Sequence, residues 1–230
     1  MRPHAHLLAT AATLAVLAGC ATKPQVSAQQ ESGIYLSRAG RSYTPPGPAG
    51  DPWGPYVTEA SAKYDVPQRW IREVMRQESG GRLYSRSGAP ITSSAGAMGL
   101  MQVMPGTYDE LRVRYPELGD DPFDPHNNIM AGTAYIREMY DIYGAPGFLA
   151  AYNAGPGRPR RWREGPVLEA AAWVENIPFA ETRDYVKKVL SNATYYASVL
   201  GGKGLSIRSR LGRTMGPPDP NAPPPEKDLP

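Results

Sequence analysis

Apolar residues recur at helical spacing in the middle of the chain. Ile71, Val74 and Glu78 fall three and four positions apart, so the glutamate ends an otherwise apolar stripe. This period predicts an amphipathic helix that starts with Asp65 as N-cap and Pro67 in the first turn. A carboxylate is therefore expected on the inner face of this helix.

The same period predicts further helices over residues 107–114, 126–143, 148–152 and 181–200. Gly144 follows the longest of these and is suited to end it. Strand signals are weak, and the best lies around 85–92. The fold class expected is mainly α, with at most a small β element.

The first twenty residues indicate export. Arg2 precedes an almost uncharged apolar run over 7–17, which is too short to span a bilayer, since a span needs about 20 residues. Residues 1–19 are therefore interpreted as a signal peptide. Residues 17–20 resemble a bacterial lipobox, which implies cleavage before Cys20 and acylation of that residue. The next residue is Ala21, not the Asp that retains such lipoproteins in the inner membrane, so the resemblance implies the periplasmic face of an outer membrane.

Composition divides the rest of the chain. Residues 20–55 and 202–230 are rich in proline and glycine and show no sustained period, so a lipidated linker and a disordered tail are expected. Residues 56–201 form one domain of ordinary size. The single cysteine excludes an intramolecular disulfide.

Charge argues against nucleic acid as a partner. The chain has 25 basic and 22 acidic residues, a net charge of +3, and the two signs are interspersed. One basic cluster, over 158–163, is expected to be a solvated loop or a surface for an anionic cell-wall polymer.

Glu78 is the candidate for chemistry. A carboxylate on an apolar stripe must become protonated or find a partner. The alternative is a structural role for Glu78, in a salt bridge to Arg76 or Arg82. The neighbouring sequence favours catalysis instead, because Glu78 belongs to the first of several motifs that occur in a set order.

These motifs resemble the soluble lytic transglycosylase family, whose domain has the goose-type lysozyme fold. The resemblance covers residues 60–200 and rests on Gln-Glu-Ser-Gly (77–80), Gly-Leu-Met-Gln (99–102), the segment 124–135, Ala-Tyr-Asn-Ala-Gly (151–155), Glu-Asn-Ile-Pro-Phe (175–179) and Glu-Thr-Arg (181–183). It implies a lysozyme-like α-helical domain with a groove.

The resemblance also implies roles for individual residues. Glu78 is the acid/base, and the other implied positions line the groove as substrate-binding residues: Ser93, Gln102, Met104, Tyr152, Asn153 and Glu175. Gly96 and Gly99 are expected to let backbone approach a sugar ring. The segment 79–95 is longer than usual in the family, so either Ser93 or the adjacent Ser94 matches the serine that contacts the N-acetyl group.

The implied reaction is non-hydrolytic cleavage of the β-1,4 bond between N-acetylmuramic acid and N-acetylglucosamine in peptidoglycan, which leaves 1,6-anhydromuramoyl ends. It needs one carboxylate and neither metal nor cofactor. Two alternatives remain open: a hydrolytic muramidase with Glu175, Asp109 or Glu110 as second carboxylate, and a non-catalytic peptidoglycan-binding lipoprotein. The expected partners are glycan strands and a membrane reached through Cys20, and other cell-wall or secretion-apparatus proteins are compatible with this.

Overall fold

The computed structural model describes residues 26–40, 42–199, 210–212, 214–218 and 229. Its helices are α1 (Ala28–Arg38), α2 (Gly54–Tyr64), α3 (Gln68–Ser79), α4 (Pro105–Arg114), α5 (Pro125–Tyr143), α6 (Gly147–Ala154), α7 (Gly157–Trp162), α8 (Ala170–Glu175) and α9 (Ala180–Val199). Two short strands, β1 (Leu168–Glu169) and β2 (Thr214–Met215), pair antiparallel. The mainly α class is confirmed.

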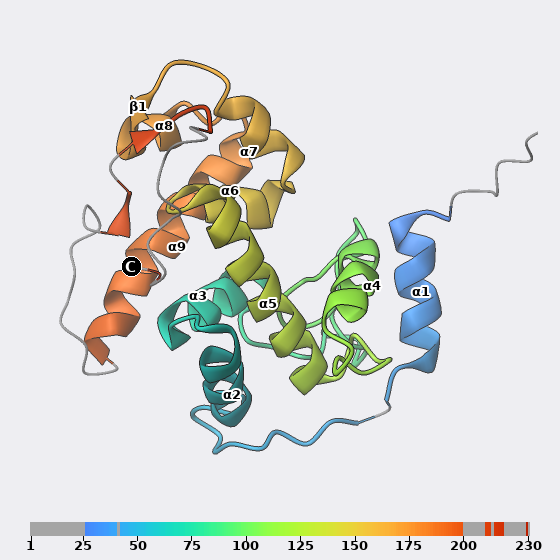
Figure 1. Ribbon diagram of the computed structural model, residues 1–230. Coiled ribbons are helices and arrows are strands. Elements are labelled where there is room, and N and C mark those ends of the chain that lie inside the picture. The colour runs from blue at the N-terminus through green and yellow to red at the C-terminus, as the bar shows by residue number, and fades with distance from the viewer. Residues whose placement is uncertain (1–25, 41, 200–209, 213, 219–228, 230) are drawn as a thin grey trace, which may run out of the picture.

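Helix α5 forms the centre of the domain (Figure 1). It packs against α2 and α6, while α9 packs against α3 and α6, and α4 and α1 lie on the opposite side of α5 from α9. The core includes an aromatic group in which Trp70 and Tyr140 both meet the ring of Phe148 edge-on, at centroid distances of 5.3 and 5.6 Å. This packing joins α3, α5 and α6, the helices that carry most of the site.

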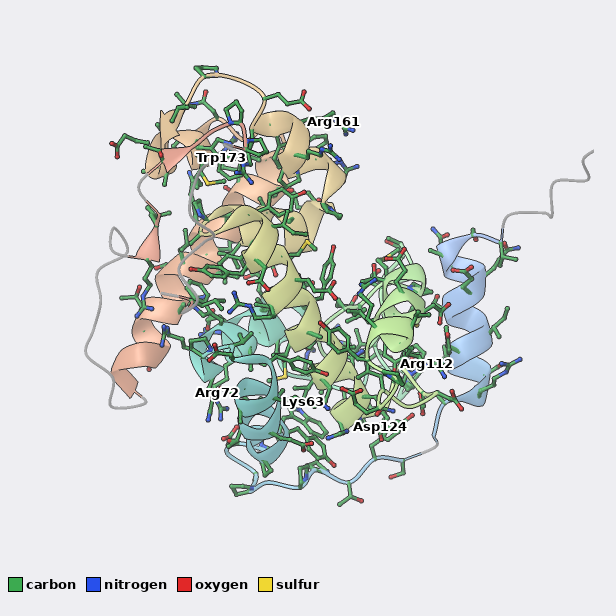
Figure 2. All side chains as sticks on the ribbon, in the orientation of Figure 1. Lys63, Arg72, Arg112, Asp124, Arg161 and Trp173 are labelled. Carbon is green, nitrogen blue, oxygen red and sulfur yellow. The ribbon has the colours of Figure 1, made fainter. Side chains whose placement is uncertain are left out.

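The predicted helices are present, with ends that local chemistry explains. The Asp124 carboxylate accepts a hydrogen bond from the amide of Asn127, and Pro125 follows as a first-turn residue. Gly144 ends α5 with φ of 61°, which glycine adopts without strain. In Figure 2, Asp124 lies at the lower end of α5, where the helix begins.

The expected N-cap of α3 is wrong. Asp65 is instead the C-cap of α2 in a left-handed conformation (φ 53°), and α3 begins at Gln68 after Pro67. Helix α2 was not predicted, and its presence gives Asp65 another role. Aspartate tolerates this conformation better than most residues, because its short side chain bonds locally.

Two regions expected to lack regular structure contain some. The linker over 20–55 includes α1, which begins with a capping box between Ser27 and Gln30. The tail over 202–230 includes β2, whose Met215 is 4% exposed and pairs with Leu168. In both cases contact with the domain, not a local period, stabilises the segment.

The expected strand around 85–92 is reduced to single bridges. Tyr84 pairs with Pro90, and Thr92 pairs with Met98. The expected signal peptide over 1–19 and the expected acylation site Cys20 lie outside the described residues. Within the described part of the chain, no helix has both the length and the apolar character needed to cross a membrane.

Candidate active site

Glu78 lies in the last turn of α3, one residue before the helix ends. Gly80 caps the helix with φ of 67°. The Ser79 hydroxyl donates to the carbonyl oxygen of Leu100 at 2.7 Å and so ties the helix end to the Gly-Leu-Met-Gln segment. The position of the carboxyl group relative to that segment is therefore fixed by buried hydrogen bonds.

The Glu78 carboxyl group is partly buried and electrostatically perturbed. Burial raises its pKa to about 7, the nearby Tyr185 hydroxyl lowers it, and the carboxylate of Glu181 raises it further. Tyr185 is itself buried, and its hydroxyl faces Glu78 without a well-formed hydrogen bond. A group with this pKa can both donate and accept a proton near neutral pH.

The salt-bridge alternative for Glu78 is not supported. Arg76 pairs with Glu73, at 3.6 Å between Nη1 and Oε1, and Arg82 donates through Nε to the carbonyl of Ser79 at 3.4 Å. Neither guanidinium forms an ion pair with Glu78. The Glu78 carboxyl group is thus available for proton transfer.

Tyr152 lies beside Glu78 and completes a group of three. Burial and the Glu78 carboxylate raise the pKa of Tyr152 far above its usual value. Its hydroxyl donates to the carbonyl of Met101 at 2.8 Å, which ties α6 to the Gly-Leu-Met-Gln segment. The structure thereby brings together Glu78, Tyr152 and Tyr185 from α3, α6 and α9. Tyr185 lies in the helix predicted over 181–200, and no functional role was expected for it.

Asn128 holds the Gly-Leu-Met-Gln segment in place through hydrogen bonds to backbone in and next to the segment. This supporting role was not predicted from the sequence. Asn128 is fully buried on α5, its Oδ1 accepts from the amide of Met101 (2.7 Å), and its Nδ2 donates to the carbonyls of Met98 (3.0 Å) and Pro122 (2.8 Å). Asn128 lies in the segment 124–135, whose resemblance to the family was the sequence signal that could have pointed to it.

The space beside Gly96 and Gly99 is filled by protein, which corrects the expectation that these glycines make room for a sugar ring. A Cβ at Gly99 would lie 2.6 Å from Asn128 Nδ2, and one at Gly96 would lie 2.6 Å from the carbonyl oxygen of Ala28. Both have positive φ, 72° and 93°. They are needed for close packing, on α5 and α1 respectively.

Gln102 and Met104 follow at the surface of this segment. Gln102 has φ of 49°, and its Nε2 donates to the Gly99 carbonyl at 2.8 Å, which leaves its Oε1 as an acceptor. Met104 is the N-cap residue of α4 and is partly exposed. Both can contact a ligand.

Ser93 and Asn153 are also partly exposed, each with one partner. The Ser93 hydroxyl oxygen accepts from the amide of Ala97 at 3.0 Å. The Asn153 Oδ1 accepts from the Thr182 hydroxyl at 2.7 Å, which links α6 to α9. Each keeps a donor for a ligand, the hydroxyl hydrogen of Ser93 and the amide group of Asn153.

Glu175 is not joined to Glu78 by any contact among the described residues. It is exposed at the C-terminal end of α8 and pairs with Lys187 of α9 at 2.7 Å. An exposed pair of this kind contributes little to stability. In the described residues there is also no group of three or more His, Cys, Asp or Glu side chains placed to hold a metal.

Comparison with known proteins identifies related families. Residues 55–169 match the Transglycosylase SLT domain, and residues 176–204 match the Soluble lytic transglycosylase helical domain. The chain is 40% identical to the soluble lytic murein transglycosylase of Escherichia coli K12 over 147 residues, 60% of this chain and 22% of the relative. It is 31% identical to membrane-bound lytic murein transglycosylase C of Klebsiella pneumoniae, over 58% of this chain and 43% of the relative.

Solved structures give the same result. The 70 kDa soluble lytic transglycosylase of Escherichia coli has a TM-score of 0.60 at 35% identity, over 70% of this chain and 26% of that one. The lytic transglycosylase Slt of Pseudomonas aeruginosa, solved as an inactive glutamate-to-glutamine mutant, has a TM-score of 0.59 at 31% identity, over 70% and 26%. The chain thus spans only about a fifth to two fifths of these relatives' lengths. The match to the SLT domain nevertheless covers half of this chain, which therefore belongs to the SLT transglycosylase family.

Proposed function

We propose that this protein is a peptidoglycan lytic transglycosylase with Glu78 as its only acid/base. The observation that carries the proposal is a partly buried carboxyl group with a pKa of about 7, set between Tyr152 and Tyr185 and free of any ion pair with Arg76 or Arg82. Relatives named lytic murein transglycosylases support the same substrate class.

The reaction uses Glu78 twice. Protonated Glu78 gives its proton to the glycosidic oxygen as the bond from C1 of N-acetylmuramic acid breaks, while the N-acetyl carbonyl oxygen of the same sugar stabilises C1. The Glu78 carboxylate then takes the proton of the C6 hydroxyl, whose oxygen attacks C1. One bond to C1 is exchanged for another, no water is consumed, and Glu78 ends protonated.

Hydrolysis would need a second carboxylate to activate water. Of the three weighed from the sequence, Asp109 accepts a hydrogen bond from Tyr35, Glu175 is paired with Lys187, and Glu110 is exposed on α4. These contacts favour transglycosylation, in which the substrate supplies its own nucleophile.

We assign the remaining groove residues to substrate binding. Ser93, Gln102 and Asn153 each offer a donor or acceptor suited to hydroxyl and N-acetyl groups, and Met104 offers an apolar side chain. We assign Glu175 to the outer part of the groove, where its ion pair with Lys187 would have to break before it binds a sugar.

We also propose a lipid anchor on Cys20, after removal of residues 1–19. The lipobox-like sequence supports it, and so does the similarity to membrane-bound lytic murein transglycosylase C of Klebsiella pneumoniae. The destination would be the periplasmic face of the outer membrane.

Mass spectrometry of the muropeptides released from purified peptidoglycan tests the reaction. A 1,6-anhydro end is one water lighter than the reducing end that hydrolysis produces. Products with only anhydro ends are expected. Reducing ends would support the muramidase, and no release would support the binding protein.

A further inference from the structure

Helix α1 lies outside the matched family domain, which begins at residue 55. It has 11 residues, and helices shorter than about 12 residues are marginal in water. Packing on the domain must therefore stabilise it. The face that packs is defined by spacings of three and four residues.

That face attaches to α4. Ser32 is buried at 2% exposure, and Tyr35 and Leu36 pack against the core. The Tyr35 hydroxyl donates to the carboxylate of Asp109, and its ring meets that of Tyr108 edge-on at 6.3 Å. One end of α1 is thus fixed on the helix that follows Met104.

The N-terminal end of α1 meets the turn over 93–97. Gln29 Nε2 donates to the carbonyl oxygen of Ser94 at 3.2 Å. The carbonyl of Ala28 lies so close to Gly96 that a Cβ there would come within 2.6 Å of it. Gly96, which was expected to face a sugar, therefore lies against the backbone of α1.

The same turn presents Ser93, the proposed N-acetyl contact. The Ser93 amide donates to the carbonyl of Ala97 at 2.9 Å, and its hydroxyl oxygen accepts from the amide of Ala97 at 3.0 Å. These bonds hold the turn internally, and the bridge between Thr92 and Met98 anchors its base to the domain. Helix α1 holds the outer side of the turn.

Part of the contact between α1 and α4 is polar and incompletely filled. A pocket of about 600 Å³ separates part of the two helices and is lined by residues of both charges, including Glu31, Arg38 and Arg112. Figure 2 shows Arg112 on the side of α4 that faces α1. Release of α1 should therefore leave the core of the domain folded.

We propose that α1 is a positioning helix for the substrate groove, because it holds the turn over 93–97 and so places Ser93. The proposal rests on the function proposed above. Loss of the docked helix weakens binding of the glycan strand, while the chemistry at Glu78 continues.

Gly33 offers a test at one site. It lies in the middle of α1, is exposed, and a Cβ there meets nothing within 4 Å. Gly33→Pro breaks the helix, because proline removes a backbone donor and clashes with the preceding turn. Gly33→Ala is the matched control, since alanine favours the helix. Amide hydrogen exchange over 27–38 in the full chain checks that only the proline variant loses α1.

The readouts are steady-state cleavage of isolated glycan strands and affinity for insoluble peptidoglycan. For Gly33→Pro we expect KM to rise and affinity to fall roughly 2- to 10-fold, the range that follows from losing about one net hydrogen bond, with kcat unchanged. Gly33→Ala should match wild type. Unchanged KM and affinity with α1 released would overturn the proposal, as would a loss of kcat alone. Failure of the proposed function looks different, because wild type itself would then release no anhydro products while the affinity comparison still tests α1.

Discussion

Replacement of Glu78 by glutamine tests the acid/base assignment, and Glu73→Gln is its matched control. Both glutamates lie on α3, and burial raises the pKa of each to about 7. Glu73 is fully buried and is paired at 3.6 Å with Arg76, whereas Glu78 is partly exposed and has no such pair among the described residues. The two changes are thus alike in chemistry and differ in position.

The catalytic effect should separate the two variants. Glutamine is close to isosteric with glutamate but cannot transfer the proton. Loss of a general acid/base costs about 10²- to 10⁴-fold, and Glu78→Gln should lose at least this because one group serves both steps. Glu73→Gln should retain activity similar to wild type.

The effect on stability has a defined sign. A carboxyl group whose folded pKa is raised from 4.5 to about 7 stabilises the fold fully below pH 4.5, and this contribution is lost as pH rises through 7. The shift corresponds to about 3 kcal/mol at full strength, and screening at the partly exposed Glu78 reduces it to roughly 1–2 kcal/mol. Glu78→Gln should therefore be as stable as wild type or slightly more stable at pH 8, with a flatter dependence on pH.

Three measurements on one preparation decide the matter: muropeptide release, binding to insoluble peptidoglycan, and thermal unfolding at pH 5 and pH 8. Release by Glu78→Gln within tenfold of wild type would refute the catalytic role. So would unfolding of Glu78→Gln together with a proportional loss of activity, since that is the behaviour of a structural ion pair.

Further predictions concern the neighbours of Glu78 and the anchor. Because the Tyr185 hydroxyl lowers the pKa of Glu78, Tyr185→Phe should move the alkaline fall of kcat/KM, expected near pH 7, to higher pH; a pH–rate profile with an unmoved limb would contradict this. Tyr152→Phe removes the hydrogen bond to Met101 and should lower the free energy of unfolding by about 1 kcal/mol as well as turnover, measured by denaturant unfolding and product release. Cys20→Ala should abolish membrane association in cell fractionation, and retention of the variant in salt-washed outer membranes would exclude the anchor.

The sequence by itself determined the features that depend on local pattern. Apolar residues spaced three and four apart predicted α3 and α5, and glycine at 144 predicted the end of α5, because these signals act within a few turns of one helix. The ordered motifs identified the family and predicted the role of Glu78. These required no knowledge of which segments meet in space.

Only the tertiary structure decided what surrounds Glu78. Tyr185 lies more than a hundred positions along the chain and reads as an apolar stripe residue, yet its hydroxyl faces the carboxyl group. Asn128 supports the Gly-Leu-Met-Gln segment from α5, and Gly96 is required by α1. Such contacts join segments that are distant in sequence, and a single sequence carries no local signal for them.

The same reason explains the two segments expected to be irregular. Helix α1 and strand β2 are short, and neither has an apolar stripe as long as that of α5. Each is ordered by what it packs on, α4 and the turn over 93–97 for the helix and β1 for the strand. The capping box of α1 is a local signal, but most of the free energy that stabilises both segments comes from burial against the domain. Their order therefore depends on the tertiary structure.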